Sequence, residues 1–282
     1  MGTLPVKRWL EEAGVRPSRR MGQSFLADAS ALDRIAREAL AGSEEWILEI
    51  GAGPGNLTER LLAPGRRVVA IERDRRLAAL CARRLAGRPD LTVVAGDALA
   101  MPVRKHLAPG TIAAAGNIPY SITGEIVRAL GDDLLGVGRA VLLVQEEAAD
   151  RMAAQPGSDG YGGFSILTQA RWNVTPLFAV PAGSFHPRPE VDSRLVVLER
   201  PADPAVKPAL YPLVRRLVHE AFQRRRKTLA NGLQPFLDEL NAFGDAPLVI
   251  RAAGLDPGQR PETVPVEGWV RIAEALRGIL RS

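Results

Sequence analysis

Four short apolar segments in the first half of the chain each end at a glycine or a polar residue. The segments are 46–50, 67–71, 91–96 and 111–115, and the residues after them are Gly51, Glu72, Asp97 and, one glycine later, Asn117. Helical patterns separate these segments, an alternation that is typical of a parallel α/β sheet. Because parallel strands end at one edge, where open α/β sheets bind ligands, the pattern predicts a ligand site built from these four residues.

The first segment runs directly into a glycine-rich turn. Gly51-Ala52-Gly53-Pro54-Gly55 follows the apolar segment 46–50, and a helical pattern begins shortly afterwards. Glycines let the backbone approach a ligand, and the start of a helix offers free N–H groups. The spacing is not that of the dinucleotide-binding Gly-x-Gly-x-x-Gly. The chain also lacks the phosphate-binding loop of nucleoside triphosphatases.

Acidic residues at the next two strand ends suit a nucleoside. Glu72 lies about 20 residues after the start of the glycine-rich turn, where a carboxylate can accept hydrogen bonds from both ribose hydroxyls. An exposed charge at a strand end is the alternative. Asp97, followed by Ala98 and Leu99, could accept a hydrogen bond from an adenine amino group. Together, the strand ends favour a nucleoside cofactor.

The fourth strand end, Asn117-Ile118-Pro119-Tyr120, could hold the amino group of a planar base. Asn117 carries a side-chain carbonyl, and Pro119 favours an extended Ile118 whose carbonyl can point the same way. Two acceptors favour the pyramidal amine that attacks an electrophile, and so stabilise the transition state. Tyr120 offers a ring face for stacking. The alternative is an ordinary tight turn, in which Asn and Pro are common.

Beyond Tyr120 the sequence predicts three more strands and then a helical region. The strands are expected at 140–145, 174–180 and 194–198. Two prolines interrupt the pattern at 201–204, and the apolar spacing is helical from there on. We therefore expect a sheet domain in residues 1–200 and a small all-helical domain in residues 201–282.

Composition argues against several classes of protein. No apolar stretch is long enough to span a membrane, and the polar, basic N-terminus lacks the apolar core of a signal peptide. The single cysteine, Cys81, allows no internal disulfide and indicates a reducing cytoplasm. Three scattered histidines predict no metal site. A net charge of +5 is compatible with a nucleic-acid partner.

Seven motifs occur in the order found in one enzyme family. They are 22–26, 49–55, 96–99, 117–120, 160–162, 185–193 and 222–229. On these motifs the chain resembles the ribosomal RNA adenine N6-dimethyltransferases, the KsgA/RsmA group, over residues 20–230. The resemblance implies a Rossmann-like α/β fold: a seven-stranded methyltransferase sheet, mostly parallel with its last strand antiparallel, followed by a small all-helical C-terminal domain.

The resemblance also implies an activity and a set of site residues. S-adenosyl-L-methionine would donate two methyl groups, by direct displacement and without a metal, to N6 of each of two adjacent adenines near the 3′ end of small-subunit rRNA. The expected cofactor-binding residues are Gln23, Ser24, Leu26, Gly51, Gly53, Glu72, Asp97, Ala98 and Asn117. The expected catalytic residues are Asn117, Ile118, Pro119, Tyr120 and Phe185, with Phe185 stacked on the second face of the target base.

The expected partner is small-subunit rRNA, or the 30S particle, bound by a monomer. Its affinity should come largely from phosphate contacts of cations. We expect these to be Arg19, Arg20, Arg188, Arg224, Arg225, Arg226 and Lys227. For the run 224–227, the alternative is a solvated helix face.

Three positions depart from the family pattern: Ser24 replaces a usual Asn, Ile118 a usual Leu, and Gly124 a frequent proline. Asn-Ile-Pro-Tyr is commoner in 23S rRNA methyltransferases of the macrolide-resistance type, so that activity stays an alternative. The other two alternatives are a non-catalytic RNA-binding assembly or transcription factor on the same scaffold, and an adenine-specific DNA methyltransferase. The motifs at 160–162 and 225–229 favour the small-subunit enzyme.

Overall fold

The computed structural model describes residues 2–18, 22–131, 136–224, 226–240 and 245–280. The chain divides into two compact units, each formed from two segments. The first unit contains residues 1–149 and 174–200, and the second contains residues 150–173 and 201–282. One boundary between the two units therefore lies after Arg200, the position expected for the domain boundary. Residues 150–173, expected in the first domain, belong to the second unit, because helix α7 (Gly163–Gln169) packs against helix α8 (Tyr211–Gln223).

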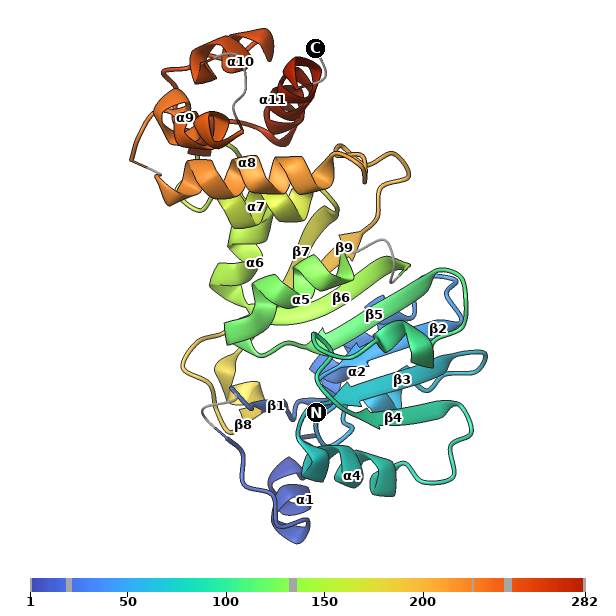
Figure 1. The fold of residues 1–282 in the computed structure, drawn as a ribbon. Coiled ribbons are helices and arrows are strands. Elements are labelled where there is room, and N and C mark those ends of the chain that lie inside the picture. Colours follow the sequence, from blue (N-terminus) through green and yellow to red (C-terminus); the bar gives the residue numbers. More distant parts are fainter. Residues whose placement is uncertain (1, 19–21, 132–135, 225, 241–244, 281–282) are drawn as a thin grey trace. The chain divides into compact units, whose positions relative to one another are not determined.

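The first unit is built on a seven-stranded sheet with the order β4-β3-β2-β5-β6-β9-β7 (Figure 1). The strands are β2 (Trp46–Ile50), β3 (Arg67–Glu72), β4 (Leu91–Ala95), β5 (Ile112–Asn117), β6 (Val137–Gln145), β7 (Asn173–Val180) and β9 (Ser193–Glu199). Strands β4, β3, β2, β5 and β6 pair in parallel, whereas β9 pairs antiparallel with β6. The predicted fold class is thus confirmed, including the antiparallel last strand.

The sheet has a tight contact where β5 runs beside β2. Ala113, Ala114 and Ala115 are all buried, and their small side chains occupy both faces of β5. At the next residue, Gly116, an added Cβ would lie 2.5 Å from the Ile50 carbonyl oxygen. Only glycine therefore fits there, and the ends of β2 and β5 lie close together at the carboxyl edge.

Helices surround the sheet, and two of them begin at aspartate caps. Asp28 accepts a hydrogen bond from Ala31 N (3.0 Å) at the start of α2 (Ala29–Ala39). Asp74 accepts one from Arg76 N (2.9 Å) at the start of α4 (Arg75–Arg84). The other helices of this unit are α1 (Val6–Glu12), α3 (Thr58–Leu61), α5 (Thr123–Leu130) and the start of α6 (Glu146–Ala153). The apolar side of α2 packs on β5 and β6, in the cluster that forms the core of this unit.

A second, two-stranded sheet was not predicted. Strand β1 (Phe25–Leu26) pairs antiparallel with β8 (Phe185–His186), with Leu26 opposite Phe185. Isolated two-residue strands carry no periodicity, so the sequence gives no signal for this pairing. The pairing joins the N-terminal segment to the loop 185–193, two motifs that are far apart in the chain.

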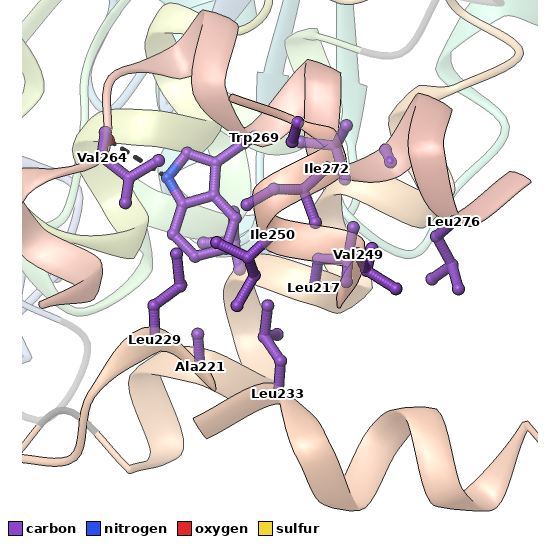
Figure 2. Packing of buried hydrophobic residues seen from close by; sticks show 14 of the residues in the cluster. Leu217, Ala221, Leu229, Leu233, Val249, Ile250, Val264, Trp269, Ile272 and Leu276 are labelled. Atoms are coloured by element: carbon purple, nitrogen blue, oxygen red, sulfur yellow. Dashed lines mark hydrogen bonds between the residues drawn. The ribbon is translucent and has the colours of Figure 1, made fainter. Parts of the chain in front are cut away.

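The second unit is helical in the residues that the structure describes, as predicted for the C-terminal part. Besides α7 and α8 it contains α9 (Leu229–Glu239), α10 (Ala246–Ala252) and α11 (Val266–Ile279). Its core gathers around the fully buried Trp269, whose Nε1 donates to the Val264 carbonyl (3.2 Å; Figure 2). Tyr161, from the earlier segment, donates to the same carbonyl (3.0 Å) and is also buried. Among the described residues, no helix combines the length and apolarity that crossing a membrane requires.

Candidate functional site

A cavity of about 540 Å³ opens at the carboxyl edge of the sheet, entirely within the first unit. Binding sites for small ligands typically have volumes of about 300–1,000 Å³. The residues that line it include Gln23, Ser24, Gly51, Glu72, Asp97, Ala98, Asn117, Ile118, Pro119 and Tyr120. The four strand ends thus meet at one cavity, as the sequence predicted.

Glu72 is fixed by the backbone around it. Its Oε2 accepts from Gly53 N (2.9 Å), and its Oε1 accepts from Asp74 N (2.8 Å). The residue is only 7% exposed, and this burial raises the pKa of the carboxyl, although the backbone hydrogen bonds oppose the shift. Each carboxylate oxygen keeps further acceptor capacity. Glu72 can therefore accept hydrogen bonds from a pair of ligand hydroxyls.

Asp97 is held in a similar way at the end of β4. Its Oδ1 accepts from Leu99 N (3.0 Å), and its Oδ2 lies 3.5 Å from Arg73 Nε. Ala98 and Arg73 both line the cavity beside it. The site therefore presents a second oriented carboxylate next to a small side chain and a guanidinium. No sequence motif pointed to Arg73.

Asn117, the last residue of β5, has a defined side-chain orientation. Its Nδ2 donates to the Ser24 carbonyl (2.8 Å), which leaves Oδ1 as the free acceptor of the amide. The next residue, Ile118, donates its N–H to the Leu143 carbonyl (2.9 Å), and its side chain is buried. No residue in the described part of the chain donates to the Ile118 carbonyl. The loop therefore offers two acceptors beside the cavity.

Tyr120 follows in a short 3-10 helix, Tyr120–Ile122, and lines the same cavity. Its hydroxyl lies 3.0 Å from Ser193 Oγ, a hydroxyl that is completely buried. Burial raises the pKa of Tyr120, the Ser193 bond opposes this, and the Asp192 charge adds to it. Sequence analysis gave Ser193 no individual role, and only its place in the 185–193 motif pointed to it.

The N-terminal segment contributes Gln23 and Ser24. Gln23 Oε1 accepts from Ser18 N (2.8 Å), and the Gln23 side chain also interacts with the Asp74 carboxylate and helps to lower its pKa. Ser24 Oγ donates to the Pro187 carbonyl (2.6 Å), so its hydroxyl is already engaged with the loop 185–193.

Three predicted site residues do not line the cavity. Leu26 and Phe185 are 3% and 5% exposed, and both pack in the core of the first unit. The prediction that Phe185 stacks on a target base is not supported, because the β1–β8 pairing turns this ring into the core. Gly53 acts through its N–H on Glu72, and an added Cβ there would lie 2.9 Å from the Phe25 ring.

The predicted RNA-binding cations are distributed over both units. Arg188, in the first unit, is exposed, as are Arg224, Arg226 and Lys227 in the second. Arg19, Arg20 and Arg225 lie outside the described residues. The described part of the chain contains no cluster of His, Cys, Asp or Glu that could hold a metal ion.

Comparisons with known proteins agree on one family. Residues 16–276 match the family model described as ribosomal RNA adenine dimethylase. A ribosomal RNA small subunit methyltransferase A of Geobacter sulfurreducens is 38% identical, over 93% of this chain and 96% of the relative. The protein of that name from Phenylobacterium zucineum is 37% identical, over 97% and 93%.

Solved structures show the same fold. A dimethyladenosine transferase from Plasmodium falciparum is 27% identical with a TM-score of 0.74, covering 88% of this chain and 95% of that one. The 23S rRNA methyltransferase ErmE is 28% identical with a TM-score of 0.67, covering 90% and 99%.

Proposed function

The chain belongs to the ribosomal RNA adenine dimethylase family, and we propose that it transfers methyl groups from S-adenosyl-L-methionine to two adjacent adenines near the 3′ end of 16S rRNA. The relatives matched over most of the chain are named small subunit methyltransferases, whereas the large-subunit enzyme is a structural neighbour at 28% identity. We therefore do not favour the 23S rRNA activity.

The observation that carries this proposal is the orientation of Asn117. Because Nδ2 is bonded to the Ser24 carbonyl, Oδ1 and the Ile118 carbonyl remain as acceptors beside the cavity. Two acceptors suit the two hydrogens of an exocyclic adenine amine. Tyr120, fixed through Ser193, supplies a ring face on which the base can stack.

The cavity fits the cofactor in its arrangement of donors and acceptors. Glu72 would accept hydrogen bonds from the ribose hydroxyls, and Asp97 from the adenine amino group. Gln23 also lines the cavity, and its amide would donate to the carboxylate of the cofactor. When bound there, S-adenosyl-L-methionine supplies an electrophilic methyl group on a positively charged sulfur.

Catalysis would then depend on how the protein holds the acceptor amine. The adenine must leave its base stack to reach the cavity. Asn117 Oδ1 and the Ile118 carbonyl would accept the two N–H hydrogens, which favours the pyramidal amine over the conjugated one. Pro119 keeps Ile118 extended, so that its carbonyl points toward the same amine. These residues would thus hold the amine with its lone pair free to react with the electrophilic methyl group that the cofactor would supply.

For the substrate we propose the 30S particle, bound by a monomer in the cytoplasm. The first unit would act as the methyltransferase domain and the helical C-terminal region as the RNA-binding domain. The net charge of +5 and the exposed cations at 188, 224, 226 and 227 support an electrostatic interaction with rRNA phosphates. Arg19, Arg20 and Arg225 are included in this proposal on sequence alone.

The test is methyl transfer from labelled S-adenosyl-L-methionine to unmodified 30S particles. Purified 50S subunits, naked 16S rRNA and duplex DNA serve as parallel substrates, and Asn117→Ala as the control variant. We expect label at adenine N6 in the small-subunit rRNA and none with the variant. Label in 23S rRNA or in DNA would reassign the substrate. Cofactor binding without transfer to any substrate would indicate a non-catalytic binding factor.

A further inference from the structure

The glycine-rich turn is held on its outer side by one guanidinium of helix α4. Arg84 Nη1 donates to the Pro54 carbonyl and lies 3.5 Å from Asn56 Oδ1. Its Nη2 lies 3.5 Å from Glu59 Oε2. Only 16% of the Arg84 side chain is exposed, and it does not line the cofactor cavity. The residue therefore contacts the turn from outside the cavity.

Helix α1 completes the surroundings of this guanidinium. The Arg84 Cζ atom lies 3.5 Å from the centre of the Trp9 ring, within the range of a cation–π interaction. Val6 and Leu10 of α1 share a buried cluster with Leu77 and Leu80 of α4. Apolar packing thus fixes α1 on α4, and the Trp9 ring covers one face of the guanidinium.

Asn56 connects the same turn to the N-terminal strand. The residue is 5% exposed, and its Nδ2 donates to the Leu26 carbonyl of β1 (2.8 Å). Ser24 lies two residues before Leu26 in the same segment, and its carbonyl accepts the hydrogen bond from Asn117 Nδ2. Polar contacts and a short piece of strand therefore form one continuous path, from Arg84 through Asn56 and β1 to Asn117.

The glycine-rich turn packs closely against helix α4, which lies on the side of the turn away from the cavity. Gly55 has a φ of +87°, and an added Cβ would lie 2.9 Å from Cys81 Sγ and 3.3 Å from Leu85 Cδ1. The backbone of the turn thus touches one side of α4 directly. Glycines leave the turn itself little conformational preference. Glu72 holds Gly53 N of the turn at the cavity, and Arg84 and Asn56 hold the turn to helix α4 and strand β1.

We propose that Arg84 and Asn56 are positioning residues for the cofactor, which fix the glycine-rich turn to helix α4 and to strand β1. This proposal rests on the proposed use of S-adenosyl-L-methionine at the cavity. Arg84 acts through the Pro54 carbonyl, and Asn56 acts through the Leu26 carbonyl. Gly51, in the same turn as Pro54, and Ser24, two residues before Leu26, both line the cavity. Loss of either residue should widen the range of positions that the turn adopts and weaken cofactor binding.

The test is calorimetric binding of S-adenosylhomocysteine to the full-length protein and to Asn56→Ala, Arg84→Ala and Arg84→Lys. The two alanine variants should bind about fivefold to tenfold more weakly, the change expected when one hydrogen bond is lost. Arg84→Lys should recover part of the affinity, because its ammonium can still donate to the Pro54 carbonyl but cannot reproduce the planar fork. In the methylation assay, KM for the cofactor should rise while kcat at saturation stays within about twofold.

A matched variant separates positioning from general destabilisation. Val197→Ala removes apolar volume from strand β9, at a buried residue that does not line the cavity. It should lower the melting temperature at least as much as the other variants and leave the dissociation constant unchanged. Wild-type affinity in both alanine variants would overturn the proposal, as would an equal loss of affinity in Val197→Ala. A wild-type protein that does not bind S-adenosylhomocysteine would contradict the proposed function itself.

Discussion

At the scale of single residues, the amine site depends on which atoms of Asn117 are already engaged. The sequence indicated that this residue could supply an acceptor. It could not indicate the partner of Nδ2, because Ser24 lies 93 residues earlier in the chain. That long-range bond decides the direction of the amide, and hence which of its atoms is left for a ligand.

Asn117→Asp tests this orientation with almost no change in volume. A carboxylate would place an oxygen against the Ser24 carbonyl, and two acceptors repel each other, so the side chain should turn away from its present position. We expect kcat on 30S particles to fall by about 10²–10³-fold, as for other losses of an oriented polar group at a reacting centre. The measurement is single-turnover methylation at saturating cofactor. Ser24→Ala keeps the carbonyl and should retain most of the activity; a similar loss in both variants would contradict the assignment.

Glu49, directly before the cavity residues Ile50 and Gly51, provides a pH-dependent prediction. Burial is the main cause that raises the pKa of this carboxyl from 4.5 to about 7, and the charge of Glu72 adds to it, whereas a hydrogen bond with Thr58 opposes it. Between these pH values the folded protein holds a proton that the unfolded chain has lost. The free energy of unfolding should therefore fall as the pH rises from 4.5 to 7.

The measurement is urea denaturation of the wild type and Glu49→Gln at several pH values between 5 and 8, a range chosen to cover the upper part of this transition. The variant cannot ionise, so the wild type should lose stability relative to it by up to ~3 kcal/mol over the whole transition. A constant difference between the two proteins across this range would show that Glu49 ionises at an ordinary pKa.

At the scale of helices and strands, periodicity sufficed for most elements of the first unit. Strand β3 lies at the apolar segment 67–71, and helix α4 lies in the helical pattern between that segment and 91–96, as predicted. The β1–β8 sheet was missed because two-residue strands have no period. Phe185 belongs to this unpredicted sheet, and its ring packs in the core of the first unit.

Gly116 shows how one glycine controls the contact between two strands. In Gly116→Ala, the added Cβ would meet the Ile50 carbonyl at 2.5 Å, so β5 must move away from β2 at the point where Asn117 begins the loop. We expect a destabilisation of about 1–3 kcal/mol, as for other overpacked sites, together with weaker cofactor binding. Gly183→Ala is the control, because nothing lies within 4 Å of its added Cβ. Equal stability of the two variants in urea denaturation would contradict the strand contact.

At the scale of the whole molecule, the two compact units differ from the predicted domains in one segment. Residues 150–173 precede the last two strands of the sheet in the chain, and for that reason they were predicted to belong to the sheet domain. Their assignment to the second unit depends on long-range packing. Tyr161 joins the core around Val264, about 100 residues later, and no local pattern encodes that contact. A truncation after residue 200 would therefore leave part of the second unit without its core.

The proposed RNA-binding cations make a prediction about the charge of the molecule as a whole. If Arg224, Arg226 and Lys227 each contact a phosphate, binding to 16S rRNA releases counterions, and log Kd rises with log salt concentration. Replacing all three by Gln should reduce this slope by roughly 2–3 and leave cofactor affinity unchanged.

Arg251→Gln, also exposed and in the second unit, is the control and should change the slope little. An unchanged slope in the triple variant would mean that these cations face solvent rather than RNA. A reduction of about 0.7–0.9 in the control, the same per charge removed as in the triple variant, would mean that only the net charge matters, because specific contacts depend on where each cation lies.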